Sequence, residues 1–357
     1  MKKKLNLTQV AKHLGVSIAT VSNAFNRPDQ LSNKLRERIL EESAKLGYHG
    51  PNMAARSLRM GASGVIGVML ADSLTYSFSD PVASQLLQGI SEVLVENKKQ
   101  LLILSGNVDS AEQSTAESLP DGFILYGTPR KKSIEQIERL GKPIVKVDSR
   151  STTSHTVNIN NREGAREIAL HAITNGNLLP TDPSPLSVLG LRLIDNERIC
   201  RLNSNDVDNE SQEISQSRLA GYLDAAQQSK INLPFDKIWH IPINKAENAE
   251  VAAREALTTY PQPKLLLCMS DIIALSALKV ARELGIKVPE EVMITGFDDI
   301  PEAGRSEPGI TTICQQSIEK GRVAANLLIQ SISEEVPLKH LTLDTRLVVR
   351  RSCPAST

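Results

Sequence analysis

Residues 7–26 read LTQVAKHLGVSIATVSNAFN, and their spacing is typical of two short helices that are joined by a glycine turn. Thr8 is predicted to cap the first helix and Ser17 the second, since hydroxyl groups accept bonds from the free N–H groups there. Gly15 between them can adopt the positive φ of a tight turn. The apolar residues that hold the two helices together are then Leu7, Val10, Ala11, Leu14, Val16, Val21, Ala24 and Phe25.

The exposed side of the second helix is suited to the major groove of DNA, where a helix that lies in the groove reaches the base edges. Thr20, Ser22 and Asn26 offer hydroxyl or amide groups to phosphates, and N–H groups at the start of the helix add to them. An ordinary helical hairpin within a protein core is the alternative interpretation. The DNA-binding candidates of this stretch are Thr8, Ser17, Ile18, Ala19, Thr20, Ser22, Asn23 and Asn26.

This stretch resembles the helix-turn-helix of the LacI/GalR family of bacterial transcription regulators, whose members typically begin with V-A-x-x-x-G-V-S-x-x-T-V-S-x-x-x-N. The matching residues are Val10-Ala11, Gly15-Val16-Ser17, Thr20-Val21-Ser22 and Asn26. The similarity continues along nearly the whole chain, through Arg36-Glu37-Arg38-Ile39, Leu46-Gly47-Tyr48, Pro51-Asn52, Ala54-Ala55-Arg56-Ser57-Leu58 and the core to Arg350. Many relatives carry arginine at the position of Asn23, so the operator sequence cannot be copied from them.

Charge is divided unevenly along the 357 residues, although the formal net charge is +0. Residues 1–60 contain 11 Lys and Arg against 4 Asp and Glu, whereas the remaining residues contain 30 against 37. A basic head on an acidic body implies that nucleic acid contacts the head only. The chain length suits such a small head followed by a large body of two lobes.

The composition disfavours several classes of protein. Lys2-Lys3-Lys4 is not followed by the apolar segment of a signal peptide, and no apolar run approaches the roughly 20 residues of a membrane span. We therefore expect a soluble, cytoplasmic protein without membrane contact, in which these lysines form a phosphate-contacting arm. The cysteines lie far apart, without a CxxC motif or a ligand spacing with the histidines, so we expect no metal, disulfide or cofactor.

A hinge is expected between head and body. Ser32 is predicted to begin a third helix that Gly47 ends, and Asn52 can then cap a short helix from Met53 to Met60. Two turns of helix are marginal alone in water, so this segment is expected to form only when it docks. The resemblance implies that it pairs with its twofold mate in the minor groove, where Leu58 wedges between base pairs. A flexible linker is the alternative. The candidates here are Asn52, Ala55, Arg56 and Leu58.

From Gly64 onward, short apolar runs alternate with helical patterns, which predicts parallel sheets that helices cover on both faces. The predicted strands are 65–70, 101–104, 122–126, 143–147, 186–191, 238–241, 264–269 and 292–295. The predicted helices are 81–97, 134–140, 162–174, 218–229, 246–260 and 271–284. The fold class is therefore α/β, with a small all-α helix-turn-helix head and a two-lobed body of parallel sheets.

The resemblance implies that this body has the type I periplasmic-binding-protein fold, in which the chain crosses between the lobes three times. The expected domains are a head (1–49), a hinge helix (50–61) and an effector-binding and dimerisation body (62–357). Lobe one is expected to take residues 62–160 and 297–325, and lobe two residues 161–296 and 326–357.

Polar residues that follow predicted strands are effector-site candidates, because open parallel sheets bind ligands at the carboxyl ends of their strands. Asp72 and Asp148 occupy such positions, although Asp148 can equally cap a turn. Arg218 begins an R-L-A-G-Y segment that resembles a family signature whose arginine reaches the effector. Asp271 matches the aspartate of the family motif S/N-D-x-x-A-L, also an effector contact in relatives. Carboxylates suit vicinal hydroxyl groups, and arginine donates a rigid fork.

Other residues of the body have competing interpretations. Tyr76 and Phe78 lie in the expected loop after the first strand, where relatives place residues that cover the effector. Trp239 lies within a predicted strand and is assigned to the core, and Asp298-Asp299 is expected to hold an interlobe crossover. The polar segment 194–217 is longer than a normal connection and lacks the central glycine of a calcium loop. It is predicted to be a mobile flap or a loop at the dimer edge.

Enzyme interpretations fail on local context. The glycine-rich run from Gly61 to Gly67 precedes a strand, whereas a dinucleotide-binding loop follows one and opens a helix. There is no P-loop and no Ser/His/Asp set at a recognised elbow. We therefore predict a homodimeric repressor that binds a palindromic DNA operator and senses a small polar effector, a sugar or sugar derivative. A purine or nucleotide effector is the alternative, followed by a sugar-binding transport receptor and, last, an α/β enzyme.

Overall fold

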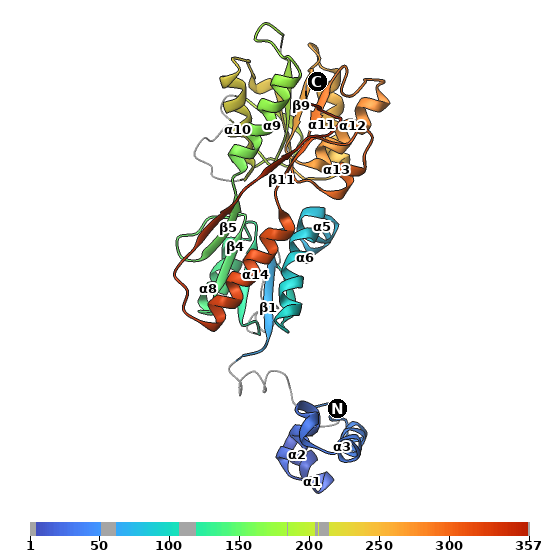
Figure 1. The fold of residues 1–357 in the computed structure, drawn as a ribbon, viewed down its shortest axis with the longest axis vertical. Helices are drawn as coiled ribbons and strands as arrows, with labels where there is room; N and C mark the ends of the chain where they lie inside the picture. The colour runs from blue at the N-terminus through green and yellow to red at the C-terminus, as the bar shows by residue number, and fades with distance from the viewer. Residues whose placement is uncertain are drawn as a thin grey trace. The chain divides into compact units, whose positions relative to one another are not determined.

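The computed structural model describes residues 5–50, 62–106, 119–183, 185–203, 206 and 214–355. The chain forms two compact units, one of residues 1–65 with 112–121 and the other of residues 66–111 with 122–357. The first unit contains a helical head, and the second contains two α/β lobes (Figure 1). The hinge candidates Asn52, Ala55, Arg56 and Leu58 lie outside the described residues.

The head consists of α1 (Leu7–Leu14), α2 (Ile18–Asn26), the 3-10 turn η1 (Pro28–Gln30) and α3 (Asn33–Lys45). Ser17 and Ser32 cap α2 and α3 as predicted, and Gly15 has a φ of 65°. The predicted cap of α1 is wrong, because Thr8 already lies within the helix and Asn6 is its cap. Asn6 accepts a bond from the Gln9 N–H, and the Gln9 side chain accepts one from the Asn6 N–H, which satisfies two backbone donors reciprocally.

The core of the head joins all three helices. Phe25 contacts Tyr48 edge-on, with ring centroids 5.6 Å apart, and this contact holds the chain after α3 against α2. The buried members of this core are Val10, Ala11, Leu14, Val21, Ala24, Ile39 and Tyr48. The predicted apolar faces are therefore confirmed, and the opposite side of α2 is left for contact with a partner.

The first lobe contains a six-stranded sheet of order β12-β5-β4-β3-β1-β2. The strands are β1 (Val65–Leu70), β2 (Gln100–Ser105), β3 (Gly122–Tyr126), β4 (Ile144–Val147), β5 (His155–Ile159) and β12 (His340–Leu343). The helices are α5 (Leu74–Ser79), α6 (Pro81–Glu96), α8 (Lys131–Arg139) and α14 (Ser317–Ser333). Helices α6 and α14 touch backbone to backbone, because a Cβ at Gly89 would lie 1.9 Å from the Ile318 carbonyl oxygen.

The second lobe contains a five-stranded sheet of order β10-β9-β6-β8-β7, in which only β7 is antiparallel among the described strands. The strands are β6 (Leu186–Leu191), β7 (Cys200–Arg201), β8 (Ile238–Ile241), β9 (Leu265–Cys268) and β10 (Met293–Thr295). The helices are α9 (Asn161–Asn175), α10 (Ile214–Gln228), α11 (Ala246–Thr258), α12 (Asp271–Glu283) and α13 (Pro301–Arg305), and Phe235–Lys237 is the 3-10 turn η2.

Alternate residues of one strand serve two cores on opposite faces of this second sheet. Val188 packs into the core with α9 and α10, whereas Leu189 packs into the core with α11 and α12. Trp239 is fully buried in the second of these cores, as predicted. Figure 1 shows the two helix pairs on either side of the strands.

The division of the C-terminal residues between the lobes differs from the prediction. Residues 326–343 are expected in the second lobe, but α14 packs on the first sheet and β12 pairs in parallel with β5. Residues 297–313 are expected in the first lobe, but Phe297, Ile300 and Ile313 pack in cores of the second. The chain returns to the second lobe through β13 (Arg346–Val348), which pairs with β11 (Thr312–Cys314), and Cys353 enters that lobe's core. The predicted long loop 194–217 also differs, because it contains β7 and the first residues of α10.

Candidate functional site: an exposed recognition helix and an interlobe cavity

The exposed side of α2 presents small, uncharged side chains. Ile18 is 47% exposed, Ser17 and Ala19 are exposed beside it, and Thr20, Ser22, Asn23 and Asn26 are partly exposed. Thr8 is exposed on α1. No Lys, Arg, Asp or Glu lies within α2, so its outer surface offers hydrogen bonds and apolar contact rather than charge.

Local hydrogen bonds fix several of these side chains. The Ser17 Oγ atom accepts a bond from the Thr20 N–H at 3.0 Å, and the Asn26 Nδ2 atom donates to the Ser22 carbonyl at 2.9 Å. The Asn23 Nδ2 atom donates to Gln30 Oε1 at 3.1 Å. The sequence pattern did not indicate Gln30, because it follows α2 in a separate turn. One amide hydrogen of Asn23 and its carbonyl oxygen remain available for a base edge.

The second unit contains a cavity of about 1270 Å³ between its lobes. Polar residues at the carboxyl ends of strands from both sheets line it, as expected for parallel sheets. Four of the predicted effector residues are on its wall, namely Asp72, Tyr76, Asp148 and Arg218. The structure therefore brings together residues that are up to 146 positions apart in the chain.

An ion pair crosses the cavity between the lobes. Arg192 follows β6 in the second lobe, and its Nη2 atom lies 3.0 Å from Oδ1 of Asp72 in the first lobe. The Arg192 guanidinium also lies over the Tyr76 ring, 5.9 Å from the centroid. Burial raises the pKa of Tyr76, with the Asp80 carboxylate as the next cause. The strand-end rule that selected Asp72 applies equally to Arg192, which the sequence analysis missed.

Asp148 follows β4 and has a φ of 54°, which is uncommon for a residue with a side chain. Its Oδ2 atom accepts a bond from the Lys320 Nζ atom at 2.6 Å, and Lys320 is fully buried on α14. The Oδ1 atom has no hydrogen-bond partner among the described residues. Arg192 and Asp298 on the same cavity wall also have positive φ angles, of 50° and 128°. Strained backbone of this kind concentrates at functional sites.

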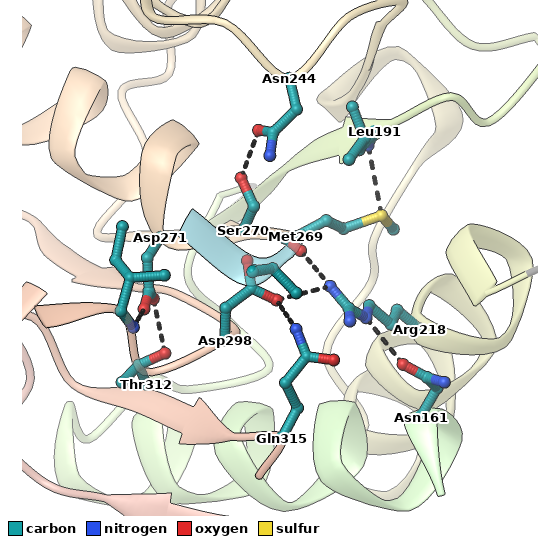
Figure 2. Close-up of polar contacts among 12 residues, drawn as sticks. Asn161, Leu191, Arg218, Asn244, Met269, Ser270, Asp271, Asp298, Thr312 and Gln315 are labelled. Carbon is teal, nitrogen blue, oxygen red and sulfur yellow. Dashed lines mark hydrogen bonds and ion pairs between the residues drawn. The ribbon is translucent and has the colours of Figure 1, made fainter. Parts of the chain in front are cut away.

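Arg218 on α10 is buried at the second-lobe side of the cavity (Figure 2). Its Nε atom donates to Asn161 Oδ1 at 2.9 Å, and its Nη1 atom donates to the Met269 carbonyl at 2.6 Å. The guanidinium carbon lies over the Phe297 ring, 3.6 Å from the centroid, and the Nη1 atom lies 3.5 Å from Asp298 Oδ1. These contacts hold the guanidinium rigid.

Two predicted effector residues do not line the cavity. The Asp271 carboxylate is fully buried and accepts bonds from the Thr312 hydroxyl at 2.5 Å and the Ile300 N–H at 2.9 Å (Figure 2). Burial raises the pKa of Asp271 to about 6. Asp271 therefore holds the crossover segments against the start of α12, and the motif alone did not reveal this. Phe78 is 60% exposed on α5, a helix where a loop was expected.

Within residues 5–50, 62–106, 119–183, 185–203, 206 and 214–355, no group of His, Cys, Asp and Glu could hold a metal ion. Within the same ranges, no helix is both long enough and apolar enough to cross a membrane. The free cysteines are Cys200, Cys268, Cys314 and Cys353.

Comparisons with known proteins agree with the sequence resemblance. A model of the lacI family of bacterial regulatory proteins matches residues 6–52, and one of a periplasmic binding protein-like domain matches residues 198–353. An HTH-type transcriptional regulator of Mycobacterium tuberculosis is 34% identical, and the match covers 98% of this chain and 97% of that protein. A ribose operon repressor of Halalkalibacterium halodurans is 26% identical over 97% of this chain and 96% of its own.

A solved structure, of a transcriptional regulator CelR–cellobiose complex, has the same fold with a TM-score of 0.67 and 24% identity, covering 98% of this chain and 99% of that chain. The predicted fold class is thus confirmed, with a helix-turn-helix head and a periplasmic-binding-protein-like body. The relatives named here are regulators of transcription rather than enzymes. The chain therefore belongs to the LacI family of bacterial regulatory proteins and is a DNA-binding transcriptional regulator.

Proposed function

We propose that this regulator is a cytoplasmic repressor whose operator affinity is controlled by a small polyhydroxy compound, a sugar or sugar derivative, bound in the interlobe cavity. The observation that carries the proposal is the cavity wall, which offers carboxylate acceptors and guanidinium donors from opposite lobes. A hydroxyl group both donates and accepts, so a polyol can satisfy both kinds of partner. The names of two relatives support the same class, a ribose operon repressor and a regulator in complex with cellobiose.

The proposed effector site consists of residues on both sides of this cavity. Carboxylates on the first-lobe side accept bonds from vicinal hydroxyl groups, and the rigid fork of Arg218 donates from the second lobe. Tyr76 offers an aromatic ring for apolar contact with a sugar face. Asp271 and Phe78 are not part of the proposed site, because neither residue lines the cavity. The proposed residues are Asp72, Tyr76, Asp148, Arg192 and Arg218.

The DNA-binding half of the proposal requires two copies of the chain. A homodimer reads a palindromic operator, with α2 of each head in the major groove of one half-site. The hinge candidates Asn52, Ala55, Arg56 and Leu58 contact the minor groove between the half-sites, where Leu58 acts as the wedge. The exposed, uncharged side of α2 supports base contact, and the positive charge of residues 1–60 supports attraction to phosphates.

A calorimetric screen tests the effector proposal. Ribose, cellobiose, other neutral sugars, their phosphate esters and purines are titrated into the full chain, and operator fragments are then shifted on gels with and without each binder. We expect a sugar to bind and to change operator affinity. Tight binding of purines, without binding of any sugar, would mean that the effector is a purine or nucleotide. Binding that leaves operator affinity unchanged would mean that the cavity does not control the head.

A further inference from the structure

Five buried polar side chains form a continuous path from one lobe to the other, and we name this path the interlobe chain. Its members are Asp148, Lys320, Gln315, Asp298 and Arg218, and each is less than one tenth exposed. Asp148 and Lys320 belong to the first lobe, and Arg218 belongs to the second. Asp298 follows β10 and bridges to Cys314 of β11, and Gln315 directly follows β11. The two ends of the interlobe chain are therefore proposed effector contacts in different lobes.

The contacts of the interlobe chain run in a fixed order. The Lys320 Nζ atom donates to Asp148 Oδ2 at 2.6 Å and to Gln315 Oε1 at 2.8 Å. The Gln315 Nε2 atom donates to Asp298 Oδ1 at 2.6 Å, and this oxygen faces the Arg218 Nη1 atom at 3.5 Å (Figure 2). Gln315 thus accepts at one end of its amide and donates at the other, which no carboxylate can do.

Burial makes the five side chains of the interlobe chain dependent on one another. A buried ammonium or carboxylate that loses its partner is strongly unfavourable, so neighbouring groups shift together rather than separate. Burial raises the pKa of Asp298, and the Arg218 guanidinium opposes this rise. Lys320 does not line the cavity, whereas the other four members do. Lys320 therefore affects a bound molecule only through Asp148 and Gln315.

We propose that Lys320 and Gln315 are positioning residues that couple the effector contacts of the two lobes. This inference rests on the proposed function, that a small effector binds in the cavity. A hydroxyl group that binds Asp148 shifts the carboxylate relative to Lys320, and Gln315 passes this shift through Asp298 to Arg218. The contributions of Asp148 and Arg218 to effector affinity are then not independent. A purely structural role for the interlobe chain predicts lower stability but independent contributions.

A double-mutant cycle in the full chain distinguishes these roles. Asp148→Asn and Arg218→Lys are made singly and together, first in the wild-type background and then with Gln315→Met. Gln330→Met is the matched control, because Gln330 lies exposed on α14 and bonds only Glu334 among the described residues. The measured quantity is the dissociation constant of the tightest-binding neutral sugar among ribose, cellobiose, glucose and galactose, by calorimetry.

We expect coupling between Asp148 and Arg218 of about 5- to 150-fold in the wild-type and Gln330→Met backgrounds, the usual range for coupled sites. In the Gln315→Met background the coupling factor between Asp148 and Arg218 should fall below about 2, although each folded variant still binds the sugar. Lys320→Met is expected to act in the same way, compared with Lys279→Met on the exposed side of α12, where Lys279 pairs with Glu250 at 2.7 Å. If Lys320→Met fails to fold, Gln315→Met and Gln315→Glu carry the test.

Independent contributions in the wild-type background, or coupling that survives Gln315→Met, would overturn the inference while leaving the proposed function intact. Failure of every sugar to bind the wild-type chain would instead reject the proposed function, and the inference with it. Thermal unfolding of each variant shows whether a change in affinity follows from a loss of structure. A change in stability without a change in coupling would assign the interlobe chain a structural role only.

Discussion

The recognition helix and the interlobe cavity place their functional residues in opposite ways. The DNA-binding candidates of α2 and its cap lie within residues 17–26, and they are exposed or partly exposed and uncharged. The cavity takes its charged residues from positions between 72 and 298, and several are buried in ion pairs. A helix can present a surface by its own periodicity, whereas a cavity between sheets depends on the whole topology. The two regions should therefore respond differently to mutation.

The largest expected effect comes from separating the two regions. Deletion of residues 1–61 should abolish operator-specific binding, a loss of at least about 10³-fold, because the α2 surface and the basic residues leave with it. Sugar binding to the remaining body should persist, as measured by calorimetry. Operator binding by the truncated chain would show that DNA contacts lie outside the head.

The next effect compares a buried arginine with an exposed one. Arg218→Met leaves Asp298 without its buried guanidinium and should lower the free energy of unfolding by about 3–5 kcal/mol. The Arg162 side chain is 60% exposed and pairs with Asp224. Arg162→Met breaks this pair and should lower the free energy of unfolding by only about 0–1 kcal/mol. Denaturant unfolding of both variants measures the difference. Equal losses would mean that the buried contacts of Arg218 add nothing to stability.

Asp271 should make stability depend on pH. Its folded pKa of about 6 lies above the ordinary value of 3.8, so the folded state holds this proton more tightly than the unfolded state does. The stabilising contribution is complete below 3.8 and is lost as pH rises through about 6. Relative to Asp271→Asn, the wild-type free energy of unfolding should fall by about 2 kcal/mol between pH 4 and pH 7. A constant difference between the two proteins would contradict the raised pKa.

The smallest effect concerns base preference at α2. Asparagine pairs with adenine N6 and N7, whereas arginine pairs with guanine O6 and N7, so Asn23→Arg should shift one operator position from adenine toward guanine by about 1–3 kcal/mol. Selection of bound sequences from a randomised pool, run on both proteins, measures the shift. Gln30→Ala serves as a second variant, because the Asn23 amide then loses its partner in the head. Identical consensus sites for wild type and Asn23→Arg would assign base preference to the hinge and to DNA shape.

The predicted secondary structure succeeded where signals were local and failed where they were not. The strands at 65–70, 186–191 and 238–241 have the predicted bounds, because each is a buried apolar run. β5 (HTVNI) and β12 (HLTL) were not predicted, since both carry polar residues and gain their strand partners only in the tertiary structure. Neither α14 nor β12 was predicted, and both pack in the first lobe, which explains the misplaced boundary at residues 326–343.

The sequence by itself determined the family, the α/β class, the caps of α2 and α3, and the outward side of α2, because these follow from the spacing of neighbouring residues. It also indicated Asp72, Tyr76, Asp148 and Arg218 as cavity residues, through strand ends and resemblance. Only the tertiary structure decided that Asp271 faces Thr312 instead of the cavity, and that Lys320 lies against Asp148 across 172 positions of chain. The physical reason is that burial and charge pairing depend on which distant segments the crossovers bring together, and no local pattern encodes that.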